Sequence, residues 1–281
     1  MRLNPPQLHR VLLVSSLFFP TALYADGLAD LHQALDSLTG TTAISATLTN
    51  RFTEKRGEGK DLKEQQGAAD ILLSDEGAGL QITYGNDVLY AMEEEARLKL
   101  EDEDAPTPTR DAVNNLEASE LKTILSAATN LKRFVQKASF REEEEQQCDA
   151  GRVRILTFDL PLEAVISNKK VRDYVNDFDG QYHLWIDEQG FPLKSRLSFA
   201  GDGRAFIFFT MQAESQRTTH YEVIGDRLVV MDRAYHSAYD SSWDKSETRG
   251  NETLVLHHPA PTPEKGLLAQ CNVPAADTIK S

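Results

Sequence analysis

The sequence predicts an α+β fold that is mainly antiparallel β, with a large twisted sheet or unclosed β-barrel covered on its concave face by two helices. Three observations predict it. Apolar and polar residues alternate over many short segments, which is typical of half-buried strands. Turns rich in Gly and Asp separate these segments, as antiparallel hairpins require. Only two segments carry an apolar stripe at helical spacing.

The N-terminus has the pattern of a secretory signal peptide. Two arginines precede an apolar run, Val11–Leu23, and the small residue Ala25 closes it. The run is shorter than the roughly 20 apolar residues that a membrane-spanning helix needs. We therefore expect residues 1–25 to be removed, leaving a soluble periplasmic protein that begins near Asp26. A retained N-terminal anchor is the alternative.

The charge of the chain excludes two classes of partner. The formal net charge is −14, and removing the signal peptide takes away two arginines and no acid, which makes it −16. Nucleic acids and anionic membranes both favour a basic face, so we expect no nucleic-acid partner. No later apolar run is long enough for stable membrane insertion, and we expect a monomer.

The two cysteines of the mature chain are Cys148 and Cys271. Two cysteines in an exported protein most often form a disulfide, so we expect these two to pair. The bond would tie the C-terminal tail to a turn in the middle of the chain. Two free thiols are the alternative.

The first half of the mature chain begins with a helix over Leu28–Leu38, where leucines recur at helical spacing. An alternating strand follows over Ile44–Thr53. The polar segment Glu54–Gln66 predicts a turn or hairpin tip, and the acidic segment Glu93–Thr109 predicts a solvated edge followed by a loop. Three further strands are expected at Ala68–Leu73, Leu80–Tyr84 and Val88–Met92.

A second helix is expected over Asp111–Val135, and a short one near Lys170–Phe178. The remaining segments predict an antiparallel meander with a turn at Gly201–Gly203. Its strands are expected at Phe134–Glu145, Val153–Leu160, Gln181–Ile186, Leu193–Phe199, Ala205–Ala213, Thr218–Ile224, Leu228–His236 and Glu247–Leu256. We expect residues 26–256 to form one half-barrel-like domain and residues 257–281 to form an irregular, Pro-containing tail.

Motifs for catalysis or metal binding are weak. Ser242–Lys245 matches a Ser-x-x-Lys pattern, but the partner motifs of penicillin-recognising enzymes are absent. Asp177–Gly180 is similar to part of a calcium loop, yet the first and last ligand positions would be Val175 and Ile186, which lack side-chain oxygens. The sequence therefore predicts a protein that is not an enzyme, with no catalytic residue, metal or cofactor.

The acidic run Glu142–Glu145 has two interpretations. Such runs usually form a solvated, aggregation-resistant edge. The alternative is a docking surface for a basic partner.

The apolar strands suggest a ligand site. Phe206–Phe209 is apolar on both strand faces, and Trp185 faces away from Leu184 and its same-face neighbours. The helix-covered face could hold an apolar groove for a hydrophobic ligand, or an ordinary two-layer core could fill it. The candidate lining residues are Leu48, Phe52, Ile82, Leu125, Leu184, Phe206 and Phe208.

Two stretches resemble a known family. The helix Leu28–Leu38 with the following strand Ile44–Thr53, and the strand-turn-strand Gly180–Leu193, resemble the bacterial lipoprotein-localisation superfamily of LolA/LolB-like periplasmic proteins. The resemblance implies an unclosed antiparallel barrel, helices that plug its mouth, and an apolar cavity for acyl chains. The acidic insertion Glu93–Thr109 and the Pro-rich tail lie outside the common core of that family.

The leading functional hypothesis is a periplasmic binding or carrier protein for a lipid-like hydrophobic ligand, such as a lipid or a lipoprotein acyl chain. Burial of such a chain contributes about 0.8 kcal/mol per methylene. The alternative is a non-enzymatic protein-interaction or sensor module of the cell envelope that uses an acidic surface.

Overall fold

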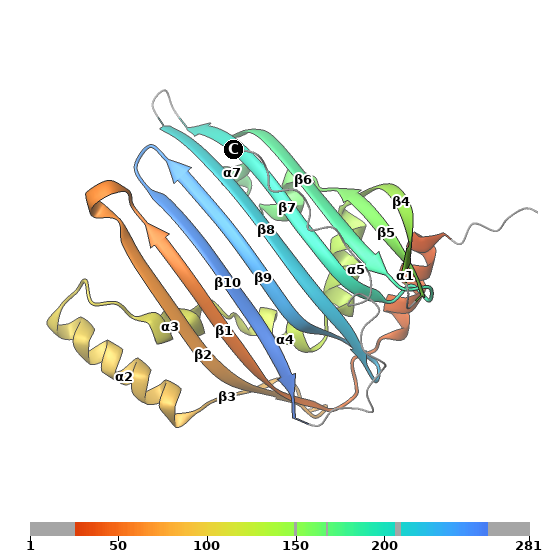
Figure 1. Ribbon diagram of the computed structural model, residues 1–281, viewed down its shortest axis with the longest axis horizontal. Coiled ribbons are helices and arrows are strands. Elements are labelled where there is room, and N and C mark those ends of the chain that lie inside the picture. The colour runs from red at the N-terminus through yellow and green to blue at the C-terminus, as the bar shows by residue number, and fades with distance from the viewer. Residues whose placement is uncertain (1–25, 149–150, 167, 206–208, 258–281) are drawn as a thin grey trace, which may run out of the picture.

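The computed structural model describes residues 26–148, 151–166, 168–205 and 209–257 (Figure 1). Its strands form one antiparallel, unclosed sheet in the order β3-β2-β1-β10-β9-β8-β7-β6-β5-β4. The sheet therefore places β1 and β10, the first and last strands of the described residues, side by side, two strands in from the β3 edge. The strands are β1 Ile44–Arg56, β2 Lys63–Asp75, β3 Gln81–Tyr84, β4 Ser139–Cys148, β5 Gly151–Asp159, β6 Val175–Ile186, β7 Pro192–Ala205, β8 Phe209–Ile224, β9 Arg227–Ser241 and β10 Lys245–Leu256.

The predicted fold class is confirmed, with more helices than expected. Figure 1 shows α1, α4 and α5 behind one face of the sheet, while α2 lies beside the β2–β3 edge. The long hairpins at the upper end of the sheet extend beyond this helix layer. The helices are α1 Gly27–Ser37, α2 Asn86–Glu101, α3 Pro108–Asn114, α4 Ala118–Leu125, α5 Ala128–Lys137, α6 Leu162–Val165 and α7 Lys169–Arg172, with a 3-10 turn at Gly59–Asp61.

The predicted strand Val88–Met92 was wrong, because α2 covers it. The predicted acidic edge at Glu93–Thr109 begins as part of α2, and the predicted loop occurs only between the end of α2 at Glu101 and the start of α3 at Pro108. Val88 is buried and Met92 packs against the core, four residues apart on one helix face. Arg97 forms ion pairs with glutamates three residues before it and four after it, which supports a helix on the exposed side. Glu93 and Glu94 thus lie on the solvated face of a helix, whereas Glu95 is buried.

The predicted helix Asp111–Val135 is three helices, α3, α4 and α5. Its apolar stripe is correct, since Leu121, Leu125, Leu131 and Val135 are all buried. The break before α5 occurs where the amide of Ala127 donates to the carbonyl oxygen of Leu228 in β9, at 2.7 Å. This bond ties the helix layer to the sheet.

The turn predicted at Gly201–Gly203 was also wrong. Gly201 and Gly203 lie inside β7, and β8 runs without a break from Phe209 through the strand expected at Thr218–Ile224. A Cβ atom at Gly203 would lie 2.6 Å from the carbonyl oxygen of Tyr174, so the glycine permits close backbone approach rather than a turn. The loop expected at Glu54–Gln66 is shorter, because β1 and β2 extend into it.

The hydrophobic core fills the space between the sheet and the helices. Leu48, Ile71, Leu156 and Leu184 from the sheet form one buried cluster with Leu31 and other apolar residues of α1, α4 and α5. Burial of this apolar area stabilises the two-layer arrangement. No helix in the described ranges is long and apolar enough to cross a membrane.

Several sequence predictions concern residues that the structure does not describe. The signal peptide, the tail after His257, Cys271, Phe206 and Phe208 all lie outside the described residues. The disulfide between Cys148 and Cys271 therefore stays a prediction.

Candidate functional site

The helix-covered face of the sheet changes from apolar to polar along the strands. Leu254, Leu48 and Ile71 are neighbours in one row across β10, β1 and β2, and all three are buried. One row further toward the hairpin end, Glu252 and Asn50 occupy the same face. The apolar core thus ends abruptly beside charged and amide side chains.

Phe52 lies in the next row, between two glycines. Gly67 of β2 and Gly250 of β10 are its cross-strand partners. A Cβ atom at Gly67 would lie 2.3 Å from the Phe52 ring, and one at Gly250 would lie 2.3 Å from the hydroxyl oxygen of Tyr235. Both glycines therefore make room for an aromatic ring lying across the neighbouring strand.

A cleft of about 540 Å³ opens at this boundary, between the sheet and the helices α3 and α4. We call it the helix-face cleft. Strands β1, β8, β9 and β10 form its floor, and α3 and α4 form its wall. It is lined by Phe52, Glu54, Arg56, Asp111, Asn115, Glu120, Arg217, Arg233, Tyr235, Ser237, Thr248 and Glu252.

A buried ion pair lies at the base of the cleft. Nη1 of Arg233 is 3.0 Å from Oε2 of Glu252, and the two residues are only 7% and 6% exposed. Burial raises the pKa of Glu252 above its ordinary value, although the charge of Arg233 opposes this effect. The Nε atom of Arg233 and the Oδ1 atom of Asn50 are buried, with no hydrogen-bond partner among the described residues. Buried polar atoms of this kind favour a bound polar group.

Three polar groups of the cleft make no ion pair or hydrogen bond within the described part of the chain. They are the Arg217 guanidinium, the Glu120 carboxylate and the Tyr235 hydroxyl. Arg217 and Tyr235 are cross-strand partners on β8 and β9, while Glu120 comes from α4. Burial and the nearby charge of Glu252 raise the pKa of Tyr235, so its hydroxyl stays protonated near neutral pH.

The other charges of the cleft are already satisfied. Arg56 lies 2.9 Å from Glu54. Asp111 accepts a hydrogen bond of 2.6 Å from the side chain of Gln65. One cation, Arg217, and one anion, Glu120, thus remain for a ligand.

Helix α3, which forms part of the wall, is held by a small number of polar contacts. The carboxylate of Glu95 in α2 accepts hydrogen bonds from the amides of Thr109 and Arg110, at 2.7 and 2.9 Å. These are first-turn amides that a helix cannot satisfy internally. The side-chain amide of Asn50 donates to the carbonyl oxygen of Ala112 at 2.8 Å, which links α3 to β1.

The candidate lining residues from the sequence do not surround one open cavity. Leu48, Leu125 and Leu184 are fully packed in the core, and Ile82 packs against it at the edge. Phe52 is the one described member of the set that lines the helix-face cleft. It joins the core to the polar part of the cleft.

The sequence analysis missed the polar residues of the cleft. Glu252 precedes Leu254 by two positions, so the alternation of β10 puts a carboxylate on the apolar face. Arg233 is the cross-strand partner of Glu252 and shares its face, but a β-bulge between Val230 and Asp232 interrupts the alternation of β9. A charge at a core-facing position could therefore have identified Glu252, whereas Arg233 depends on the strand pairing.

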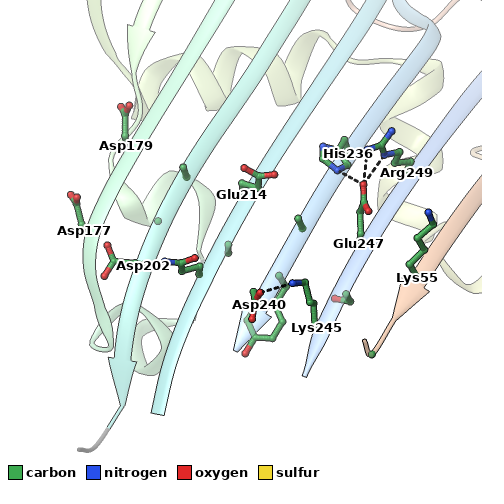
Figure 2. Close-up of a pocket in the computed structure, with 18 of the residues that line it drawn as sticks. Lys55, Asp177, Asp179, Asp202, Glu214, His236, Asp240, Lys245, Glu247 and Arg249 are labelled. Atoms are coloured by element: carbon green, nitrogen blue, oxygen red, sulfur yellow. Dashed lines mark hydrogen bonds and ion pairs between the residues drawn. The ribbon is translucent and has the colours of Figure 1, made fainter. Parts of the chain in front are cut away.

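The opposite face of the sheet, which no helix covers in Figure 1, carries a groove of about 780 Å³. Figure 2 shows its acidic side, formed by Asp177, Asp179, Asp202 and Glu214. None of these four carboxylates pairs with a cation in the described part of the chain. On the other side, Glu247 and Asp240 form ion pairs with Arg249, His236 and Lys245 (Figure 2).

The acidic run Glu142–Glu145 does not form one surface, because strand alternation divides it between the two faces of β4. Glu143 accepts a hydrogen bond from the amide of Gly27 at 3.0 Å and lies 3.9 Å from Arg154. Arg154, in turn, is 2.6 Å from Asp30 of α1. Part of the run thus fixes α1 to the sheet.

No cluster of three or more potential metal ligands occurs among the residues that the structure describes. No protein-family model matches the chain, and no curated protein matches it.

Proposed function

We propose that this chain is a periplasmic, non-catalytic binding or carrier protein for a lipid-like amphiphile. The observation that carries the proposal is the position of the helix-face cleft. It is lined mostly by polar side chains, Arg217 and Glu120 among them, and it borders the hydrophobic core at Phe52. A polar cleft beside an apolar core suits a molecule with a head group and an acyl chain.

The acyl chain would enter between α3 and the sheet. Ala112 and Val113 are the buried residues of α3, and both belong to the same apolar cluster as Phe52. Moving α3 away would break the contacts of Glu95 and Asn50 and expose apolar surface that the chain could then cover. Each buried methylene contributes about 0.8 kcal/mol, so a long chain offsets the loss of these few hydrogen bonds.

Native mass spectrometry of the delipidated mature protein with added lipids tests the proposal. We expect a 1:1 complex with myristoyl lysophospholipids below their micelle concentration. Affinity should rise with acyl length by at most about fourfold per methylene, which is the equivalent of 0.8 kcal/mol. Absence of any complex, or an affinity that does not change between hexanoyl and myristoyl homologues, would contradict a lipid ligand.

A second candidate is an envelope protein-interaction module. The observation that favours it is the groove on the helix-free face, with its four carboxylates that lack cation partners among the described residues. Crosslinking in the periplasm would test it. One basic partner should be recovered with the natural chain and lost when Asp177, Asp179, Asp202 and Glu214 are changed to the matching amides. Recovery that is unaffected by these changes would exclude this groove as the docking surface.

A further inference from the structure

We propose that the helix-face cleft selects a zwitterionic head group, a phosphate diester that carries a primary ammonium. Arg217 would bind the phosphate and Glu120 would bind the ammonium. The inference rests on the proposed function for the acyl chain, but it makes a separate claim about the head group.

The charge balance of the cleft leads to this ligand class. Its lining contains three arginines and four carboxylates. Arg56 and Arg233 each pair with a glutamate, and Asp111 accepts hydrogen bonds from Gln65 and Thr107. Of the charged side chains that line the cleft, Arg217 and Glu120 are those without a partner in the described residues. A ligand carrying one negative and one positive group would satisfy both.

Arg217 lies on the floor of the cleft and Glu120 on its wall. Arg217 extends from β8 beside Tyr235, and Glu120 extends from α4. Both line the same cleft as Tyr235 and Glu252, and Arg217 is the cross-strand partner of Tyr235. The protonated Tyr235 hydroxyl adds a neutral hydrogen-bond donor for a phosphate oxygen.

Other ligand classes would leave a charge unsatisfied. A purely anionic head group would pair with Arg217 but would lie near Glu120 and Glu252, which repel it. A purely cationic one would be repelled by Arg217 and would leave it without a partner. A neutral head group would form neither of the two charge-assisted hydrogen bonds that Arg217 and Glu120 offer.

The test compares three myristoyl lipids and one chainless compound by native mass spectrometry or calorimetry. The lipids are lysophosphatidylethanolamine, lysophosphatidylglycerol and monomyristoylglycerol, and the chainless compound is glycerophosphoethanolamine. We expect the ethanolamine lipid to bind about tenfold more tightly than the glycerol phospholipid, which is the effect of one charge-assisted hydrogen bond. Monomyristoylglycerol should bind more weakly than both phospholipids.

Substitutions in the cleft should change selectivity as well as affinity. Glu120→Gln should make the affinities for the two phospholipids about equal. Arg217→Ala should lower the affinity for both phospholipids by about tenfold or more. Glu222→Gln and Arg51→Ala are matched controls on exposed strand positions outside the cleft. A selectivity ratio measured on folded variants is insensitive to a general loss of stability.

The outcomes separate the two claims. Equal affinity for the two phospholipids would overturn the head-group inference while the acyl-chain function stands. Binding of glycerophosphoethanolamine as tight as that of the lipid would support the head-group site and overturn the lipid function. Absence of binding by all four compounds would overturn both.

Discussion

Asp226 joins the turn between β8 and β9 to the segment that follows α1. Its carboxylate accepts hydrogen bonds from the amide of Thr41, at 2.9 and 3.0 Å, and from the amide of Thr42 at 2.7 Å. The hydroxyl groups of Thr39 and Thr41 donate to the same carboxylate. These hydrogen bonds hold the pKa of Asp226 far below its ordinary value, because they favour the ionised form.

We expect Asp226→Asn to lower the thermal midpoint by a few degrees at pH 7. A carboxyl whose pKa is depressed in the fold adds stability that is complete above its ordinary pKa of about 4 and is lost as the pH falls below it. The gap between the variant and the natural chain should therefore narrow as the pH falls from 4 toward 2. Thermal unfolding followed by circular dichroism at several pH values measures this gap.

Asp70→Asn is the control, because Asp70 is exposed on β2 and its side chain forms no ion pair or hydrogen bond with the described residues. It should change the midpoint little at any pH. A gap for Asp226→Asn that stays constant from pH 7 to pH 2 would show that the carboxylate charge is not what stabilises this turn.

The orientation of individual residues within the strands was predictable from the sequence. Trp185 was expected to face away from Leu184, and it lies on the opposite face, with Nζ of Lys194 5.1 Å from its ring centroid. Strand alternation fixes such orientations. The burial of Trp185, which is 7% exposed on a face without a helix, depends on neighbouring strands that the local pattern does not show.

At the scale of elements, Glu95 determines how α2 and α3 fit together. It is 8% exposed, although it belongs to a helix whose other glutamates are mostly in solvent. Helix α3 has no side-chain cap of its own, and Pro108 in its first turn has no amide to donate. The carboxylate of Glu95 thus serves as the cap of α3 from a different helix.

We expect Glu95→Ala to destabilise the α2–α3 segment by about 1–2 kcal/mol, because it leaves two first-turn amides without an acceptor. Limited proteolysis should cut residues 86–114 faster in this variant than in the natural chain, while the sheet stays resistant in both. Glu93→Ala, an exposed position on the same helix, is the matched control. Equal cleavage rates for the two variants would contradict a capping role for Glu95.

Helices were the elements that the sequence predicted least well. Glu93–Glu95 looked like a solvated loop because the contact that buries Glu95 is made with α3, which local periodicity does not reveal. Most strands were predictable from alternation, but the pattern Gly201–Gly203 predicts a turn that the structure does not have. These glycines lie in β7 because Tyr174, distant in sequence, approaches the backbone there.

At the scale of the whole molecule, the pairing of β1 with β10 builds the candidate site. It places Phe52 beside Gly250 and Asn50 beside Glu252, residues about 200 positions apart in the chain. The sequence could indicate Phe52 as a core-facing residue of its own strand. It could not indicate the register that places Phe52 near Arg233 and Tyr235, because cross-sheet neighbours depend on tertiary packing.

The resemblance to lipoprotein-localisation proteins stays a prediction, and the helix-face cleft gives it a specific form. A cavity lined by Leu48, Leu125 and Leu184 does not exist in this conformation, because these residues pack together in the core. A lipid chain could reach them only after a helix moves. The proposed function therefore depends on the displacement of α3 from the sheet.

The separation between α3 and the sheet tests this claim most directly. Spin labels at Asn114 on α3 and Asp70 on β2, both exposed, would report this distance by pulsed electron paramagnetic resonance. The labelled chain would have Cys148 and Cys271 replaced by serine. A second pair, at Gln33 on α1 and Asp70, is the control. We expect myristoyl lysophosphatidylethanolamine to lengthen the first distance and leave the second unchanged. A first distance that stays the same at saturating lipid would contradict an acyl-chain site beneath α3.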